Sequence, residues 1–483
     1  MTALVLGLDQ GTSSTRCVAL DEALHERGSA SVPVAVSFPA PGLVEQDPEA
    51  LVDSAQQAIA GALSAAGARP GDVAALGIAN QTETFVVWER ATGRAIHPAL
   101  VWQDRRTHET CAQLRAEGHA ELVRERTGLE LDATFPATKL GWLLDHVDGA
   151  RSAADDGRLA YGDVASWLLA RLAGVHVTDA GNAARTLLCS LDALDWDAEL
   201  LEVFGVPRAV LPPVADSDRI EAVAGEIAVR AAAGDQQASL FGLRCWEPGT
   251  AKVTLGTGAF LWAQAGPTPP RAPAGVLASC AWRREATSSY ALEGFVPTAG
   301  AAVDWFGRVG ALPAGSELDA LLEETSADAA VTCVPMLQGS GTPSWDARAR
   351  GAVLGLDLGT TRADLARAVI DGILHQIVDA LEAMAERLAI DELRVDGGLS
   401  RSAWIVQRLA DLAATPVHRT TRPDCTMLGA ATLAGLAAGT WESPDALPEI
   451  AFDPVAEPSL APSARAAERE RWAAARELAA RWR

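Results

Sequence analysis

The chain has 483 residues, of which 49% are hydrophobic, and its formal net charge at pH 7 is −23. This length exceeds one ordinary hydrophobic core, so two domains are expected. The acidic balance argues against a large basic face for nucleic acid or an anionic membrane, and no apolar run approaches the roughly 20 residues of a membrane-spanning helix. We therefore expect a cytoplasmic protein that binds small molecules, not nucleic acid or membranes.

Cysteine and lysine usage narrows the chemistry further. The seven cysteines form no CxxC pair, which favours reduced, mostly buried thiols over disulfides or a zinc site. Lysine occurs only at Lys139 and Lys252, and neither position fits a P-loop or a protein-kinase strand. A protein of this composition that used ATP would hold the phosphates with backbone amides, hydroxyls and Mg²⁺.

Strands and helices alternate through the first half of the chain. Residues 3–9 and 15–22 predict an N-terminal β-hairpin, and residues 48–67 predict a helix that ends at Gly67. Further strands are expected at 73–80, 84–89 and 99–104, whereas 227–234 is interpreted as helical. This alternation is typical of an α/β domain.

A similar pattern restarts in the second half. Residues 250–266 predict a second hairpin, 289–309 a strand, glycine-rich turn and helix, 363–388 a long amphipathic helix, and 392–419 a strand, helix and strand. We place the domain boundary near residue 244, which gives domains 1–244 and 245–483. The tail at 461–483 is interpreted as a charged, solvated surface helix.

Two hairpin turns share glycines and hydroxyls. They read LDQGTSST at 8–15 and LGTGAF at 255–260. Glycine lets backbone N–H groups approach an anion, and the hydroxyls can donate to its oxygens, so each turn suits part of a triphosphate. A plain hairpin turn is the alternative for either one. Asp9, buried in a strand end, needs a partner, which a Mg²⁺ ion supplies.

Two further segments carry candidate groups. Asp235, in Gly-Asp-Gln-Gln, is either a helix N-cap or a base that takes a proton from an attacking hydroxyl, and both roles are compatible. The VDGG stretch at 395–398 suits a flat ring lying against backbone, or only a tight connection between strand and helix.

Other residues have plainer interpretations. Asp104, Arg105 and Arg106 form either a surface ion-pair cluster or, for Asp104, a substrate contact. Packing is the expected role of five tryptophans, at 142, 167, 305, 404 and 472.

Eleven segments in order along the chain resemble the FGGY carbohydrate kinases, and glycerol kinases most closely. They are LDQGTSSTR (8–16), GLVEQDP (42–48), GIANQTET (77–84), VWQDRRT (101–107), ATKLGWLLD (137–145), HVTDAGNAARTLL (176–188), GDQQASLFG (234–242), GTGAFL (256–261), YALEG (290–294), RARGAVLGL (348–356) and RVDGG (394–398). The resemblance implies two actin-like (ribonuclease H-like) ATPase domains of α/β class, which close an interdomain cleft on ATP and a polyol or sugar.

The same resemblance implies residue roles. Asp235 matches the catalytic base, and Asp9 and Asp235 match the Mg²⁺ site. The nucleotide-binding positions are Thr12, Ser13, Arg16, Thr257, Gly300, Asp304, Gly398 and Ser402, with Asp304 and Ser402 standing where glycerol kinases have Gln and Asn. The substrate-binding positions are Thr82, Glu83, Trp102, Thr134, Asp235, Gln236 and Phe260.

The substrate pocket departs from the glycerol kinase pattern. Thr82 replaces an Arg and Thr134 aligns with a Tyr, so fixed hydrogen-bond donors are lost and space opens. The expected function is ATP-dependent phosphorylation of a polyol or sugar hydroxyl, glycerol kinase-like with an altered pocket. A longer-polyol or ketose (xylulokinase-like) kinase is an alternative, as is a non-catalytic sugar sensor or an actin-like filament or chaperone ATPase. The resemblance also implies a homodimer or homotetramer.

Overall fold

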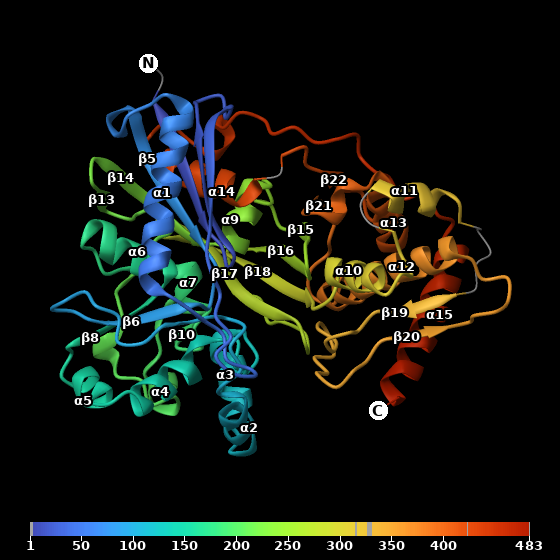
Figure 1. Ribbon diagram of the computed structural model, residues 1–483, viewed down its shortest axis with the longest axis horizontal. Helices are drawn as coiled ribbons and strands as arrows, with labels where there is room; N and C mark the ends of the chain where they lie inside the picture. Colours follow the sequence, from blue (N-terminus) through green and yellow to red (C-terminus); the bar gives the residue numbers. More distant parts are fainter. Residues whose placement is uncertain (1–2, 314–315, 326–330, 423, 483) are drawn as a thin grey trace.

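Two six-stranded sheets organise the computed structural model, which describes residues 3–313, 316–325, 331–422 and 424–482 (Figure 1). The first sheet has the strand order β13-β14-β5-β1-β2-β3 and the second β17-β18-β16-β15-β21-β22. Helices lie against both sheets, which confirms the predicted α/β class.

The first sheet consists of β1 (Leu4–Gln10), β2 (Ser14–Leu20), β3 (Glu26–Pro33), β5 (Val73–Asn80), β13 (Ala222–Ala224) and β14 (Ile227–Gly234). The second consists of β15 (Thr250–Leu255), β16 (Ala259–Gly266), β17 (Leu277–Arg284), β18 (Thr287–Val296), β21 (Glu392–Asp396) and β22 (Val417–Arg419). Each sheet begins with an antiparallel hairpin whose first strand pairs in parallel with a later strand, β1 with β5 and β15 with β21. The second half therefore repeats the arrangement of the first.

Smaller sheets and the helices complete the fold. The four-stranded sheet contains β4 (Glu45–Gln46), β7 (Ala99–Leu100), β6 (Phe85–Glu89) and β8 (Leu159–Asp163); the two-stranded pairs are β9 (Thr178–Asp179) with β12 (Val214–Ala215), β10 (Cys189–Ser190) with β11 (Asp195–Trp196), and β19 (Thr332–Val334) with β20 (Ala352–Leu354). The N-terminal helices are α1 (Pro48–Ala66), α2 (His108–Ala116), α3 (His119–Thr127), α4 (Pro136–His146), α5 (Ala150–Asp155), α6 (Val164–Ala173), α7 (Ala180–Ala183), α8 (Ala198–Val203) and α9 (Asp235–Gly242). The later helices are α10 (Gly300–Arg308), α11 (Ser316–Glu323), α12 (Arg362–Ala385), α13 (Ala403–Ala413), α14 (Cys425–Ala437) and α15 (Pro462–Arg481).

Helix α1 shows how local sequence sets an element. The Asp47 side chain accepts a hydrogen bond from the Glu49 backbone N–H (3.0 Å), and Pro48 occupies the first helical position. Gly67 ends the helix in the left-handed conformation at φ 63°, as predicted.

Helix α14 crosses from the second half of the chain to the first sheet. Gly7 and Gly77 are paired in register on β1 and β5, and a Cβ atom at either would lie about 2 Å from a carbonyl oxygen of α14 (2.0 and 1.9 Å). Glycine is therefore required for the helix to lie directly on the sheet, where Figure 1 shows α14 beside the blue N-terminal strands. The division at residue 244 stays a prediction, because a helix of the later segment completes the core of the earlier one.

Several local predictions were wrong. Residues 227–234 form strand β14, because parallel pairing with β5 overrides the helical propensity of the alanine-rich run. The strand predicted at 99–104 covers only Ala99 and Leu100 before the chain turns. Helix α15 is present, but it is not merely a solvated surface element, since Trp472 is fully buried. Trp305, expected to pack, is 40% exposed.

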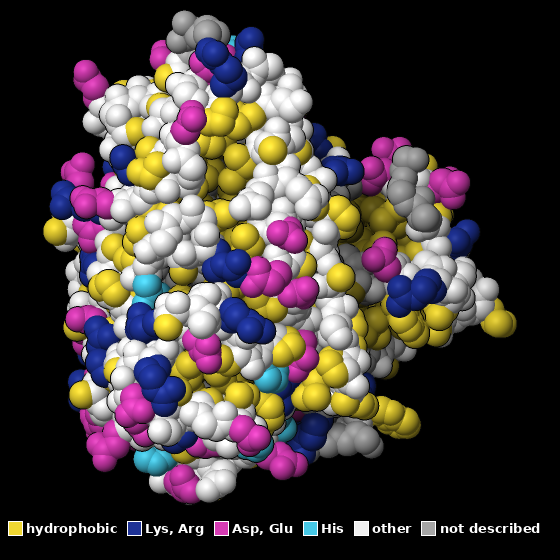
Figure 2. Space-filling view, turned by 60° about the vertical axis from the view of Figure 1, so that its left-hand side comes forward, with side chains coloured by type: hydrophobic (Ala, Val, Ile, Leu, Met, Phe, Trp, Pro, Cys, Tyr) yellow, Lys and Arg dark blue, Asp and Glu magenta, His cyan; other side chains and the backbone are white. Residues whose placement is uncertain are grey.

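All seven cysteines are buried and unpaired, as predicted. Within the described ranges, no helix has the length and apolar character needed to cross a bilayer. Figure 2 shows acidic and basic side chains interspersed over the face it presents, without a continuous basic patch on that face.

Candidate active site

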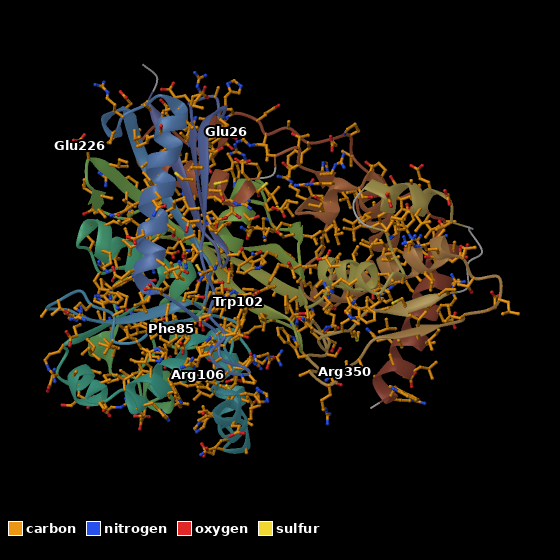
Figure 3. All side chains as sticks on the ribbon, in the orientation of Figure 1. Glu26, Phe85, Trp102, Arg106, Glu226 and Arg350 are labelled. Atoms are coloured by element: carbon orange, nitrogen blue, oxygen red, sulfur yellow. The ribbon has the colours of Figure 1, made fainter. Side chains whose placement is uncertain are left out.

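Hydrogen bonds from buried side-chain amides hold the first hairpin turn in place. Gln46 Nε2 donates to the Thr12 carbonyl (2.7 Å), and Gln81 Nε2 donates to Gln46 Oε1 (2.9 Å). Trp102 Nε1 donates to Thr12 Oγ1 (3.0 Å), and Trp102 lies in the central region where the two halves meet (Figure 3). These bonds hold the turn in place next to the substrate cavity described below.

Asp9, the residue before the last of strand β1, carries an oxygen without a hydrogen-bond partner. This atom, Oδ1, is buried. Burial and the charge of Asp235 together raise the pKa of Asp9 to about 7, against the opposing charge of Arg16. A buried carboxylate in this state fits a bound cation.

Asp235 lies where β14 gives way to helix α9. The N-cap of α9 is Gly234, so the predicted N-cap role of Asp235 was wrong; the carboxylate instead accepts from the Gln236 backbone N–H (2.8 Å). Burial and the charge of Glu83 raise its pKa to about 6, and Lys252 opposes that shift. This pKa suits a group that accepts a proton near neutral pH.

A cavity of about 200 Å³ brings together every predicted substrate-binding residue. Its lining comes from both halves of the chain: Thr12, Gln81, Thr82, Glu83, Trp102, Glu130, Asp132, Thr134, Phe135, Arg185, Asp235, Gln236, Phe260, Leu277, Glu293, Phe295 and Trp345. Five of these side chains are carboxylic acids, and Arg185 is the one cation among the described lining residues. The charged side chains of the cavity are therefore mainly hydrogen-bond acceptors.

Glu83 is held in an unusual conformation inside this cavity. Its φ of 62° lies in the left-handed region, which a non-glycine residue adopts only when its surroundings enforce it. Thr82 Oγ1 donates to Glu83 Oε2 (2.7 Å), and Arg185 Nε donates to Oε1 (2.7 Å). Arg185 also bonds Glu293 of strand β18 through both terminal nitrogens, so it joins the two halves beneath the cavity.

An ion pair holds another part of the cavity wall, at Asp132 and Thr134. Arg105 Nη1 donates to Asp132 Oδ1 (2.6 Å), and Thr134 Oγ1 donates to the same oxygen (2.7 Å). These contacts lower the pKa of Asp132 to about 2, against the effect of burial. Lys139 Nζ donates to the carbonyls of Thr134 (2.8 Å) and Val101 (3.1 Å), which fixes this wall relative to Trp102.

A second, more open cavity of about 620 Å³ lies in the later half. It is lined by Leu255, Gly256, Thr257, Gly300, Val303, Asp304, Leu318, Asp319, Gly398, Leu399, Arg401, Ser402 and Ile405, which include all five nucleotide-binding positions predicted there. A Cβ atom at Gly398 would meet nothing within 4 Å, so the backbone there faces open space. The first turn of α10 is tied to the second hairpin, since Gly300 N–H donates to Gly256 O (2.9 Å).

Four predicted positions lie outside both cavities: Asp9, Ser13, Arg16 and Asp104. Ser13 and Arg16 are exposed on the first hairpin and line neither cavity. Asp104 is buried rather than on the surface; it accepts from Arg106 and from the Val44 backbone N–H (2.7 Å), and it does not line the substrate cavity. Its role is to fix the loop that carries Trp102.

Sequence reasoning missed several cavity residues that set its charge and shape, among them Glu130, Asp132, Arg185, Glu293, Phe295 and Trp345. Arg185 and Glu293 lie inside segments that carried the resemblance, so their presence in HVTDAGNAARTLL and YALEG was the available signal. Phe295 packs beside Phe260, with ring centres 4.9 Å apart, and Trp345 lies beside Phe295, with ring centres 6.4 Å apart. No spacing pattern links these aromatic residues in the sequence.

Comparison with solved structures identifies the fold. A crystal structure of Plasmodium falciparum glycerol kinase with ADP superimposes with a TM-score of 0.93 at 27% identity, covering 99% of this chain and 98% of that one. A xyloylose kinase from Brucella ovis gives a TM-score of 0.87 at 28% identity, with 98% of both chains covered. The architecture is therefore the two-domain, actin-like ATPase fold, as the sequence predicted.

Comparison with sequences identifies the family. The model of the FGGY carbohydrate kinase N-terminal domain matches residues 4–242, and that of the C-terminal domain matches residues 251–438. A glycerol kinase from Aromatoleum aromaticum is 42% identical over 494 residues, which cover 99% of each chain. These findings favour an ATP-dependent sugar or polyol kinase over a non-catalytic sensor. With both domain models matched and such identity sustained end to end, the chain belongs to the FGGY family of carbohydrate kinases.

Proposed function

We propose that this kinase transfers the γ-phosphoryl group of ATP to a hydroxyl of a neutral polyol or sugar, with Asp235 as the base. The observation that carries the proposal is the position of Asp235. Asp235 lines the substrate cavity. Its charge also raises the pKa of Asp9, which lies next to the first glycine-hydroxyl turn. Transfer of a phosphoryl group to a hydroxyl needs a base between the hydroxyl and the phosphate.

Asp235 orients the attacking hydroxyl by accepting its proton. Its raised pKa keeps the carboxylate basic enough to accept a proton as the oxygen attacks phosphorus. Trp102 and Phe260 supply apolar walls that hold the carbon chain and exclude water. Excluding water matters because a water molecule in the place of the hydroxyl would hydrolyse ATP.

Asp9 and Asp235 are the residues that would hold Mg²⁺. The described residues contain no cluster of three or more metal-ligating side chains, but Mg²⁺ bound to a nucleotide commonly uses only one or two carboxylates plus phosphate oxygens. The buried Asp9 Oδ1 without a partner supports this assignment. When bound, the ion neutralises phosphate charge that builds up during transfer.

The nucleotide would lie between the two hairpins. Thr12, Ser13 and Arg16 on the first and Thr257 on the second are the proposed phosphate contacts, and the cavity at Gly300, Asp304, Gly398 and Ser402 receives the rest of the nucleotide. Open space over Gly398 supports this placement. Ser402 Oγ accepts from the Ile405 N–H (3.2 Å), so its hydroxyl proton stays available to a ligand.

The charge of the cavity selects neutral acceptors. Its carboxylates outnumber its one cation, and Arg185 is already committed to Glu83 and Glu293. A sugar acid or phosphorylated sugar would add negative charge beside them, at a cost of several kcal/mol. Substrate hydroxyls instead donate to Asp235 and Glu83.

The threonines at positions 82 and 134 favour an acceptor longer than glycerol. Threonines stand at 82 and 134, where the resembled glycerol kinases have Arg and Tyr. Both threonine hydroxyls donate to neighbouring carboxylates, so neither offers the fixed donor of those larger side chains. We therefore propose a polyol or sugar of four or five carbons.

Two broader properties complete the proposal. Seven unpaired cysteines support a reducing compartment, the cytoplasm. Assembly as a homodimer or homotetramer stays a prediction of the family resemblance.

The test is ADP release with Mg·ATP across glycerol, tetritols, pentitols, ketopentoses and a sugar acid. The proposal expects release that depends on a neutral acceptor, with a higher kcat/KM for four or five carbons and no response to the acid. A ketopentose preference would establish the ketose kinase alternative. ADP release that ignores the acceptor, or none with any acceptor, would overturn the proposal.

A further inference from the structure

Lys252 is a buried cation beside the substrate cavity, though it does not line it. It lies on strand β15 and is fully buried, which is rare for lysine without partners. Its Nζ atom donates to Gln236 Oε1 (2.7 Å) and to Thr254 Oγ1 (2.9 Å). The first of these bonds joins the second sheet to the first turn of helix α9.

An ammonium group dictates which end of an amide faces it. Lysine carries only donors, so it bonds the carbonyl oxygen of Gln236 and not the NH₂ group. The NH₂ group of Gln236 is therefore turned away from Lys252: a hydrogen bond from this side chain lowers the pKa of Asp235, and its second N–H is left for a ligand in the substrate cavity that Gln236 lines. Without Lys252, either end of the amide could turn toward a ligand.

A hydrogen-bond donor at Gln236 complements the carboxylate acceptors that face the substrate hydroxyls. When ionised, Asp235 and Glu83 accept hydrogen bonds from substrate hydroxyls. A hydroxyl oxygen that donates to one of them can still accept a hydrogen bond through its lone pairs. The Gln236 NH₂ group supplies the donor for such an oxygen. One hydroxyl can then be fixed from two sides.

We propose that Lys252 is a positioning residue for the acceptor substrate: it fixes the Gln236 amide so that the NH₂ group faces the cavity. This inference rests on the proposed function, because it assigns a substrate contact to the same site. Lys252 itself acts through Gln236 and touches no substrate in this account.

A purely structural role makes different predictions. Asp396 at the end of β21 has a buried Oδ1 atom without a partner, and its charge acts on Lys252. If Lys252 served only to compensate Asp396, removing the ammonium would lower stability without depending on Gln236. The two roles separate in a double-mutant cycle.

The experiment compares Lys252→Met, Gln236→Leu and the double variant in acceptor-dependent ADP release. We expect each single variant to raise the KM for the acceptor about tenfold, as the loss of one hydrogen bond predicts, with a smaller change in kcat. The double variant should match Gln236→Leu within about twofold, because Lys252 acts through that side chain. Multiplicative effects in the double variant would overturn the inference.

A second variant covers the case in which Lys252→Met fails to fold. Gln236→Glu keeps an oxygen partner for Lys252, and urea unfolding checks that this variant is folded, but it presents only acceptors to the cavity. We expect the acceptor KM to rise at least tenfold in this variant, and an unchanged KM would refute the donor role of Gln236. Wild-type turnover serves as the reference: absence of turnover with every acceptor refutes the proposed function, whereas normal wild-type turnover with failed variant predictions refutes only the role of Lys252.

Discussion

Replacing Asp9 with asparagine should stabilise the metal-free protein while removing its proposed metal ligand. The pKa of Asp9 is raised from 3.8 to about 7 in the folded state. The folded state therefore holds this proton over a pH range in which the unfolded chain has lost it, and stability falls as pH rises from about 4 to about 7. Asparagine is nearly isosteric and carries no charge, so it removes this penalty.

The magnitude follows from the size of the shift. About three pKa units correspond to at most about 4 kcal/mol at pH 8, at 1.36 kcal/mol per unit. Between pH 5.5 and pH 8, the stability advantage of Asp9→Asn should grow by about 2 kcal/mol, because up to about pH 7 the folded carboxyl keeps a proton that the unfolded chain has already lost. Below pH 4 the advantage should vanish.

Urea unfolding in EDTA at several pH values measures this advantage directly. Asp53→Asn, on the exposed side of α1, is a matched control whose effect should not vary with pH in this way. In wild type, Mg·ADP should raise the unfolding midpoint, and Asp9→Asn should lose most of that increase. A pH-independent advantage for Asp9→Asn would refute the reasoning about its buried charge.

Three further predictions concern the two cavities. Arg185→Met should lower stability by about 3–5 kcal/mol, because it leaves buried carboxylates unpaired, and Glu293→Gln in the same chain should recover part of that loss in urea unfolding. Thr82→Arg should raise the kcat/KM ratio of glycerol to a pentitol at least tenfold in the ADP-release assay, because the guanidinium fills the space beside the acceptor; an unchanged ratio would count against a cavity enlarged at this position. Gly398→Val should fold normally, since its Cβ position is open, but it should weaken ADP binding at least tenfold by calorimetry. The control Gly71→Val, at an equally open exposed position, should leave ADP binding unchanged. Undiminished ADP binding by Gly398→Val would place the nucleotide elsewhere.

Local sequence signals were sufficient for the hairpins and the core of the site. Both glycine-hydroxyl turns lie between antiparallel strands, as their residue pattern predicted. Every substrate-binding position taken from the resemblance lines a single cavity, and those of the second-half nucleotide site line another. The order and spacing of the motifs along the chain carried this information, although Trp102 and Thr134 lie in loops and Phe260 lies within strand β16.

Long-range contacts were beyond what the sequence could predict. Arg185 and Glu293 meet across 108 positions, and their ion pair depends on how the two sheets are placed relative to each other. Strand β14 was misread because its alanines favour a helix in isolation, and only its pairing with β5 makes it a strand. In both cases the deciding interaction lies in tertiary structure.

The central claim is that Asp235 is the base of an acceptor-dependent phosphoryl transfer. The most direct measurement compares wild type and Asp235→Asn for ADP release with Mg·ATP and a neutral acceptor, together with nucleotide binding by calorimetry. We predict that turnover falls by a factor of about 10²–10⁴ or more, while nucleotide affinity changes by less than about threefold. Turnover retained at the wild-type level in Asp235→Asn would contradict the account.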